Sequence, residues 1–336
     1  MSLAACGPNV SPAFGPVFGG ILTEKAGWPW IFWLLAILAF VAVGLIILFY
    51  PETSRNIVGN GSIPVHGLNK RPTDLFWPSS PLKESIPTQH PKREVTIPNP
   101  LLSVTLFLDP YNTPLMLIYA FFYTDYCILQ ASLSSLFITL YHFSPLTAGL
   151  TYIPFGAGCF LAALFGGRIL NNDYRVVARK HGWKIDRVVG DDLLTFPLIE
   201  ARFRSLPVTI TLTVASMIPF GFVLEHKIHP SVPLILQFVL GMTTTFTFTL
   251  CNTLLVDLHP KRPATAQASV NLVRCAMAGV GLAVLQPLIN AVGPGWTYVI
   301  FAGLTAGSLV LWSVEVRWGM GWWRMRVEKE LKDGEG

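Results

Sequence analysis

The chain has 336 residues, of which 52% are hydrophobic and only 13% are charged, and its formal net charge is +5. Soluble domains contain about 25% charged residues, so this composition indicates a protein of the lipid bilayer. The positive charge does not indicate nucleic-acid binding, because the basic residues lie between apolar runs and form no compact basic face.

Eight apolar segments are long enough to cross a bilayer, since a helical span needs about 20 mostly apolar residues. In chain order they are 3–22, 30–50, 112–140, 146–168, 207–225, 232–256, 265–291 and 295–316. The third is longer than a span requires, so we expect it to be tilted, kinked or partly interfacial.

The first segment contains Gly15, Pro16, Gly19 and Gly20. Small residues allow close approach of helix backbones, and a proline removes one backbone donor and bends a helix. These residues therefore predict a close, bent packing seam with another helix. The alternative is a generic small-residue contact without a role in coupling. Because the chain begins inside this segment, we expect residues 1–336 to be the rear part of a longer membrane protein.

The distribution of basic residues predicts the orientation. Of the 24 Lys and Arg residues, 21 lie in the connections 51–111, 168–206 and 257–264 or in the tail after residue 316. Eight spans place these four regions on one side, and the positive-inside rule makes that side cytoplasmic. Residues 51–111 are rich in Pro and polar residues and predict a flexible cytoplasmic linker. The charged residues of the 171–206 connection are compatible with either a salt-bridged interfacial helix or a solvated loop.

The motif Gly15-Pro16-x-x-Gly19-Gly20, followed by Gly27-Trp28-x-Trp30-x-Phe32-Trp33, resembles the fifth-span antiporter motif of major facilitator drug:proton antiporters. Four further stretches resemble the fungal quinidine-resistance-like branch of that family: Pro51-Glu52-Thr53-x-Arg55-x-Ile57-Val58-Gly59-Asn60-Gly61-Ser62, Gly149-Leu150-x-Tyr152-x-Pro154-Phe155-Gly156, Asp173-Tyr174-Arg175 and Asn271-Leu272-Val273-Arg274-Cys275.

The resemblance implies an all-α integral membrane protein with a major facilitator fold that lacks the first four of twelve transmembrane helices. Residues 1–50 would form the last two helices of the N-terminal bundle, and 51–111 the linker. Residues 112–316 would form the six-helix C-terminal bundle, and 317–336 a cytoplasmic tail. It also implies a fungal plasma membrane location and a cytoplasmic gating loop with Gly167, Asp173 and Arg175.

Arg274 is the one basic residue deep in a predicted span, where a charge costs roughly 2.5–3.5 kcal/mol on insertion scales. With Gln267 and Asn271 it forms a polar stripe at helical spacing, which predicts an inward-facing position with a partner. The stripe is compatible with a substrate pathway and equally with a structural arginine that binds a neighbouring carbonyl or carboxylate.

Asp125 lies deep in the third segment beside Tyr123. Burial favours the protonated form of a carboxyl group, so Asp125 is a candidate proton carrier, with a capped or solvated acid as the alternative. Gln237 and Asn252 accompany a run of threonines in the sixth segment. They are candidates for substrate contacts, although hydroxyls in helices often bond their own backbone.

The cysteines and histidines show no metal-ligand spacing, so no metal or cofactor is expected, and the five cysteines are expected to be buried thiols. An enzyme that works in the membrane needs clustered acids or histidines, and we find none, so we predict no enzymatic activity. The resemblance instead implies a transporter of small amphipathic compounds that is coupled to protons and works by alternating access. Its partners would be the bilayer, the substrate and protons. A fragment without transport activity of its own is the alternative.

Overall fold

The computed structural model describes residues 2–50, 106–183, 196–259 and 263–334, and every regular element in these ranges is a helix. The chain divides into two units, one of residues 1–24 and 99–336 and one of residues 25–98. Helix α2 (Pro29–Phe49) belongs to the second unit, contains no charged residue and begins with a proline at its first position. None of its side chains is buried, as expected for a helix whose solvent is lipid. The predicted linker lies almost entirely outside the described residues.

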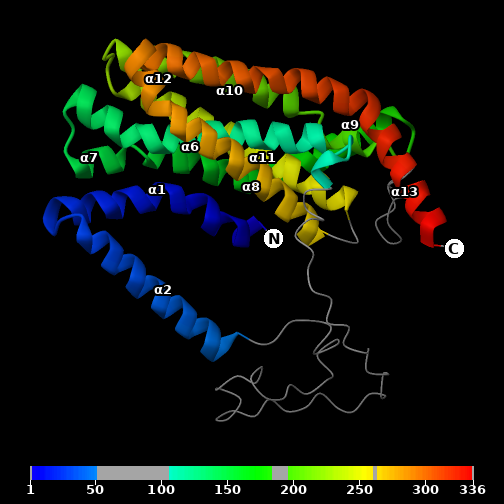
Figure 1. Ribbon diagram of the computed structural model, residues 1–336, viewed down its shortest axis with the longest axis horizontal. Coiled ribbons are helices and arrows are strands. Elements are labelled where there is room, and N and C mark those ends of the chain that lie inside the picture. Colours follow the sequence, from blue (N-terminus) through cyan, green and yellow to red (C-terminus); the bar gives the residue numbers. More distant parts are fainter. Residues whose placement is uncertain (1, 51–105, 184–195, 260–262, 335–336) are drawn as a thin grey trace. The chain divides into compact units, whose positions relative to one another are not determined.

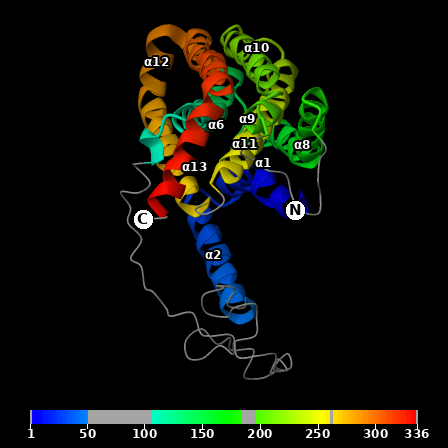
Figure 2. The same ribbon diagram turned by 90° about the vertical axis from the view of Figure 1, so that its right-hand side faces the viewer.

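The first unit contains the remaining helices (Figure 1). They are α1 (Ser2–Lys25), α6 (Thr113–Tyr141), α7 (Pro145–Leu150), α8 (Ile153–Lys180), α9 (Leu198–Arg202), α10 (Leu206–Glu225), α11 (Ser231–Leu258), α12 (Pro263–Val314), the π-helical turn Glu315–Gly319 and α13 (Met320–Gly334). The main packing pairs are α6 with α12, α8 with α11, and α10 with both α11 and α12. Figure 2 shows these long helices side by side.

Six helical stretches of the described residues are long and apolar enough to cross a membrane. The last of them, Pro263–Lys329, contains the two predicted segments 265–291 and 295–316. The predicted segment 3–22 does form a helix, α1, but it is not among the six. Its prolines, glycines and Asn9 lower its mean hydropathy, so this stretch resembles a packing element more than a lipid-facing one.

Helix α12 is two helices joined by a reversal at Gly293. This residue has φ 81°, a conformation that a side chain would strain. Pro294 follows at the start of the second segment, and the Gly295 N–H donates to Oε2 of Glu225 at 2.8 Å. A carboxylate at a helix N-terminus satisfies an otherwise free donor and favours the helix dipole. Glu225 therefore ties the end of α10 to the restart of α12.

The predicted segment 146–168 lies within one membrane-capable stretch, Pro145–Lys180, which ends later than predicted. It comprises α7 and α8, which are separated at Thr151 and Tyr152, and α8 continues to Lys180. The first part of the predicted 171–206 connection is therefore a helical extension of a span. For residues 171–180 this outcome favours the helical interpretation over the solvated loop, whereas Asp186 and Arg187 lie outside the described residues.

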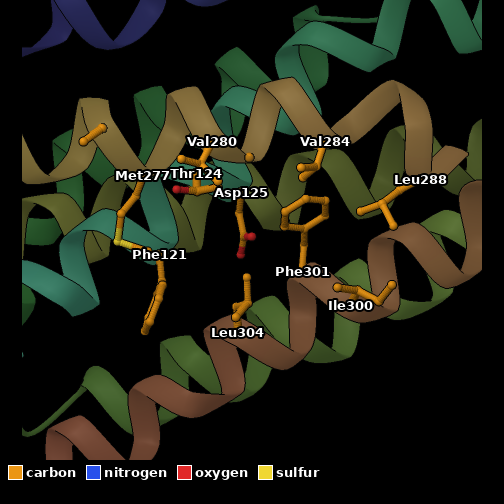
Figure 3. Close-up of a pocket in the computed structure, with 12 residues that line it drawn as sticks. Phe121, Thr124, Asp125, Met277, Val280, Val284, Leu288, Ile300, Phe301 and Leu304 are labelled. Carbon is orange, nitrogen blue, oxygen red and sulfur yellow. The ribbon is translucent and has the colours of Figure 1, made fainter.

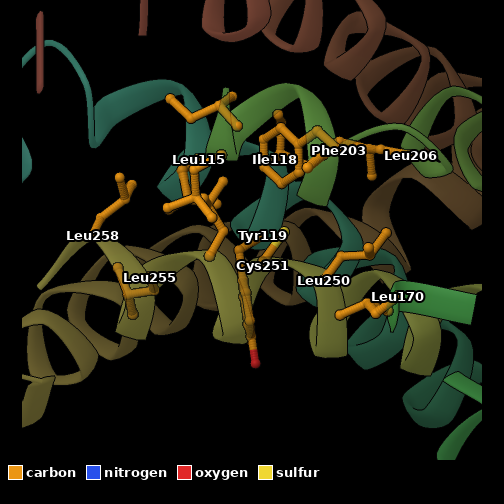
Figure 4. Close-up of a cluster of buried hydrophobic side chains, with 14 of the residues drawn as sticks. Leu115, Ile118, Tyr119, Leu170, Phe203, Leu206, Leu250, Cys251, Leu255 and Leu258 are labelled. Atoms are coloured by element: carbon orange, nitrogen blue, oxygen red, sulfur yellow. The ribbon is translucent and has the colours of Figure 1, made fainter. Parts of the chain in front are cut away.

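Two clusters of buried apolar side chains form the core of the bundle. One lies towards the start of α6 and the end of α11 and includes Leu115, Phe203 and Leu254 (Figure 4). The other lies towards the end of α6 and includes Phe137, Phe220 and Tyr298. In Figure 4 the hydroxyl group of Tyr119 points away from its apolar neighbours.

Candidate functional site

Arg274 lies on the first segment of α12 and faces two tyrosines of α6. Its guanidinium carbon lies 4.4 Å from the ring centroid of Tyr123 and 5.6 Å from that of Tyr119. Its Nη1 also donates to the Tyr119 hydroxyl at 3.2 Å. A cation over an aromatic face is attracted by the ring quadrupole, so the tyrosines hold the guanidinium in place. Among the described residues, Arg274 forms no ion pair with a carboxylate.

An aromatic row continues from these tyrosines. Phe248 of α11 stacks on Tyr119 with ring centroids 4.8 Å apart, and its centroid lies 6.1 Å from that of Tyr123 and 6.3 Å from that of Tyr126. Tyr126 in turn lies 5.9 Å from Phe155 of α8. Tyr123, Tyr126 and Phe248 are half-buried, so this row forms part of an accessible face.

Two asparagines flank the arginine. Asn271 precedes Arg274 by one helical turn on α12, and the Asn252 side chain of α11 lies beside the Tyr119 hydroxyl. The side-chain oxygens of both asparagines and Nε of Arg274 are shielded from solvent and have no hydrogen-bond partner among the described residues. Buried polar atoms without partners are uncommon and costly, which makes this cluster a candidate site for a polar ligand. We call Tyr119, Tyr123, Phe248, Asn252, Asn271 and Arg274 the Arg274 face.

The two predicted glutamines differ in burial and lie on different helices. Gln267 is half-buried, two helical turns before Arg274 on α12, and thus extends the predicted stripe. Gln237 is fully buried on α11, and neither polar atom of its amide has a hydrogen-bond partner within the described ranges. It lies about four turns before Asn252 along α11, so the sequence prediction that grouped these two residues brings together distant positions.

Asp125 is directed away from the Arg274 face. Its carboxylate accepts a hydrogen bond from the Thr305 hydroxyl on the second segment of α12, and only 5% of the residue is exposed. It lines an apolar pocket of about 390 Å³ with Phe121, Phe301 and Leu304 (Figure 3). On a helix, Asp125 is turned by about 200° from Tyr123. Asp125 and the Tyr123 ring that contacts Arg274 therefore lie on opposite sides of α6.

A further buried acid, Glu315, was not predicted from the sequence. Glu315 begins the π-helical turn after α12, is fully buried, and neither of its carboxylate oxygens has a hydrogen-bond partner in the described part of the chain. Single π-helical turns are frequent at functional sites. Its position at the end of the predicted segment 295–316 is the signal in the sequence that could have found it.

The glycine-proline motif of α1 packs against α7 and α8. A side chain at Gly20 would place its Cβ 2.6 Å from the Pro145 carbonyl oxygen, and one at Gly149 would place it 2.5 Å from the Pro16 carbonyl oxygen. Gly15 has no atom within 4 Å of such a position, and the Gly19 carbonyl accepts from Thr23 at 2.7 Å. The close approach therefore involves Pro16 and Gly20 and leaves Gly15 outside the contact.

The three predicted gating residues differ in their burial. Asp173 is buried on the extension of α8 and accepts from Nη1 of Arg204 at 2.9 Å and from the Ser205 hydroxyl. Arg175 and Gly167 are exposed, and a Cβ on Gly167 would meet no atom within 4 Å. Asp173 thus fastens the end of α8 to the start of α10, a contact that the sequence could not reveal because Arg204 and Ser205 lie 31 and 32 positions away.

The threonines of α11 form contacts between helices. Thr213 of α10 donates to Thr243 at 2.8 Å, and Thr247 donates to Thr209 of α10 at 3.2 Å. Thr249 returns its hydrogen bond to the Thr245 carbonyl of its own helix. These hydroxyls are therefore engaged in the bundle itself.

The cysteines do not all match the expectation of burial. Cys159 and Cys251 are buried and Cys127 is half-buried, but Cys275, which follows Arg274, is exposed. Within the described ranges, no group of three or more His, Cys, Asp or Glu side chains is arranged to hold a metal ion.

The long apolar helices of the described residues are those of an integral multi-pass membrane protein. Residues 1–282 match the model of the Major Facilitator Superfamily, and the chain belongs to that family.

Several curated fungal transporters are similar to this chain. The MFS-type transporter phiD of Fungal sp. is 34% identical over 98% of this chain and 50% of its own length. Citrate exporter 1 of Aspergillus niger is 31% identical over 95% of this chain and 61% of its own length. MFS antiporter QDR2 of Candida albicans is 28% identical over 86% of this chain and 57% of its own length. The chain thus spans about half to three fifths of the length of these relatives.

Proposed function

We propose that this protein moves small amphipathic compounds across the membrane by alternating access, and that the Arg274 face contacts the substrate. The observation that carries the proposal is a half-buried arginine inside a span that tyrosine rings hold in place and no described carboxylate neutralises. An intramembrane charge is costly and is retained mainly where it lines a ligand or ion pathway. The names of the relatives, an exporter and an antiporter among them, support the same activity.

Asp125 is our proposed proton carrier. Its burial in an apolar pocket and its contact with a hydroxyl group rather than a cation support reversible protonation. Its position against both segments of α12 gives protonation a direct effect on the packing of those segments. Coupling to protons and a plasma membrane location are part of the same proposal, as is the cytoplasmic orientation of the basic connections and tail.

Gly20 is proposed to allow close packing of α1 against α7 at a contact that changes during transport. Gly15 of the same motif serves as the control position. Gly20→Leu is expected to abolish transport while membrane abundance is retained, because the new side chain meets the Pro145 backbone. Gly15→Leu, in the same motif but without neighbouring atoms, is expected to transport normally. Equal transport in both variants would contradict the role of the seam.

Asp173 is proposed to act as a latch between the ends of α8 and α10 during gating, with Gly167 and Arg175 as exposed members of the same region. Its ion pair with the half-exposed Arg204 supports a contact that can open and close.

Proteoliposomes that contain the whole chain test the proposal. A pH gradient is imposed, a trapped dye reports the lumenal pH, and amphipathic compounds of different charge are added in turn. We expect at least one compound to dissipate the gradient in the wild type and none to do so with Asp125→Asn. Absence of any flux would favour the alternative that the chain does not transport on its own.

Protein-free liposomes control for passive leak. Undiminished proton-coupled flux with Asp125→Asn would exclude this residue as the carrier while leaving transport itself intact.

A further inference from the structure

We infer that the Arg274 face binds a carboxylate, so that the ligand of this protein is a small organic acid in its anionic form. This inference rests on the proposed function for its physiological meaning, but binding is testable without transport. It follows from the charge, the free hydrogen-bonding capacity and the aromatic surroundings of the site.

Charge is the first argument. Arg274 is the one basic residue of the described bundle that lies deep in a span, and no ion pair with a carboxylate is found for it among the described residues. The acid of α6, Asp125, lies on the side of that helix opposite to Tyr123. Its carboxylate accepts a hydrogen bond from the Thr305 hydroxyl. A bound anion would neutralise the guanidinium, whereas a bound cation would add a second positive charge in a poorly hydrated place.

Hydrogen bonding is the second argument. The guanidinium of arginine has five N–H donors in a fixed fork that matches a carboxylate. Here one donor is used by the Tyr119 hydroxyl, and Nε is shielded and without a partner in the part of the chain described. The unpartnered atoms of Asn252 and Asn271 are their side-chain oxygens, which accept hydrogen bonds and therefore suit a hydroxyl or amide donor elsewhere on the ligand, while the guanidinium binds its carboxylate.

The aromatic row is the third argument. Tyr123 is half-buried beneath the guanidinium, and Phe248, also half-buried, lies against Tyr123, so both rings can pack against the apolar body of an acid whose carboxylate reaches Arg274. An amphipathic acid with an aryl group fits both parts of this face, which suggests a set of probes of the same size that differ only in charge.

The test measures ligand-induced stabilisation of the purified whole chain with three such probes: phenylacetate, phenylacetamide and phenethylamine. We expect phenylacetate to raise the thermal unfolding temperature in a saturable manner, and the neutral and cationic probes to have little effect. Arg274→Gln is expected to weaken phenylacetate binding by at least about tenfold, as for loss of a charge-assisted hydrogen bond.

Two further variants separate loss of the site from loss of the fold. Arg168→Gln is the matched control, because Arg168 also stacks on an aromatic ring, that of Phe165 at 5.6 Å, but lies on α8. It should bind phenylacetate as the wild type does. Arg274→Lys retains the charge without the planar fork and should bind with intermediate affinity.

Stronger stabilisation by phenethylamine than by phenylacetate would overturn the inference, as would equal effects of all three probes, no effect of phenylacetate, or unchanged binding in Arg274→Gln. If any of these results were accompanied by transport of a cation in the proteoliposome assay, the inference of an anionic ligand would be wrong, and the proposed transport of amphipathic compounds would still hold. Phenylacetate binding without flux of any compound would support the site and contradict the proposed function.

Discussion

The arginines at the end of the bundle where α8, α9 and α11 meet differ from the arginine in its middle. Arg202 of α9 pairs with Asp257 of α11 at 2.8 Å, and Arg204 pairs with Asp173 of α8 at 2.9 Å. Arg274 has aromatic rings and a hydroxyl group in place of a carboxylate. The paired arginines fasten helices to each other, whereas Arg274, which has no carboxylate partner among the described residues, is the ligand contact that we propose. On this proposal, the contrast separates structural from functional charges within one bundle.

Removal of the most buried partner at the paired end should have the largest effect on stability. Asp173→Ala removes the carboxylate that accepts hydrogen bonds from both Arg204 and Ser205. The guanidinium and the hydroxyl group then lose this acceptor. We expect the free energy of unfolding to fall by about 2 kcal/mol, measured by thermal or denaturant unfolding in detergent. Arg175→Gln, on the same stretch of α8 but exposed, should change it by less than about 0.5 kcal/mol.

A double-mutant cycle on Arg202 and Asp257 should give a somewhat smaller effect. Both side chains are less than one quarter exposed, and Arg202 also stacks on the Tyr174 ring. We expect a coupling free energy of about 1–2 kcal/mol between Arg202→Gln and Asp257→Asn in unfolding measurements. A coupling near zero would show that this pair does not fasten α9 to α11.

Glu200 should have the smallest effect because its partners are exposed. The hydrogen bond from Lys180, with a smaller contribution from His181, lowers the pKa of Glu200 below its ordinary value of 4.5. A lowered folded-state pKa stabilises the fold above the unfolded-state pKa, and this gain disappears as the pH falls through the folded-state pKa. Glu200→Gln should therefore cost less than about 0.5 kcal/mol at neutral pH and slightly flatten the acid limb of the stability curve. An unchanged acid limb would argue against this pair.

The sequence predicted most of the helices because long apolar runs have few alternatives in a bilayer. The predicted segments 30–50, 207–225 and 232–256 agree with α2, α10 and α11 to within two residues at each end. The end of α8 was not predicted because residues 168–180 include several charged side chains. Hydropathy alone cannot show that a helix continues beyond the end of an apolar run. Segment 3–22 was predicted as a span from the length of its apolar run, and α1 is not among the membrane-capable helices because its prolines, glycines and Asn9 lower its mean hydropathy.

The candidate site was predictable only residue by residue. Arg274, Asn271 and Asn252 were recognised as polar groups in apolar segments, but the placement of Tyr119 and Phe248 around the arginine depends on the packing of α6 and α11 against α12. The sequence also could not reveal that Asp125 faces away from Arg274. Helix rotation about its own axis is set by tertiary packing, which no local pattern of α6 specifies.

The most direct test of the contrast is a paired measurement on Arg274→Gln and Arg202→Gln, in which unfolding and phenylacetate binding are followed on the same samples. Loss of Arg202 leaves Asp257 without its cation, so we expect the larger loss of unfolding free energy in Arg202→Gln and unchanged ligand binding. Arg274→Gln should lose ligand binding with the smaller loss of stability. If Arg274→Gln instead unfolds as readily as Arg202→Gln and still binds phenylacetate, Arg274 is a structural arginine and the account is wrong.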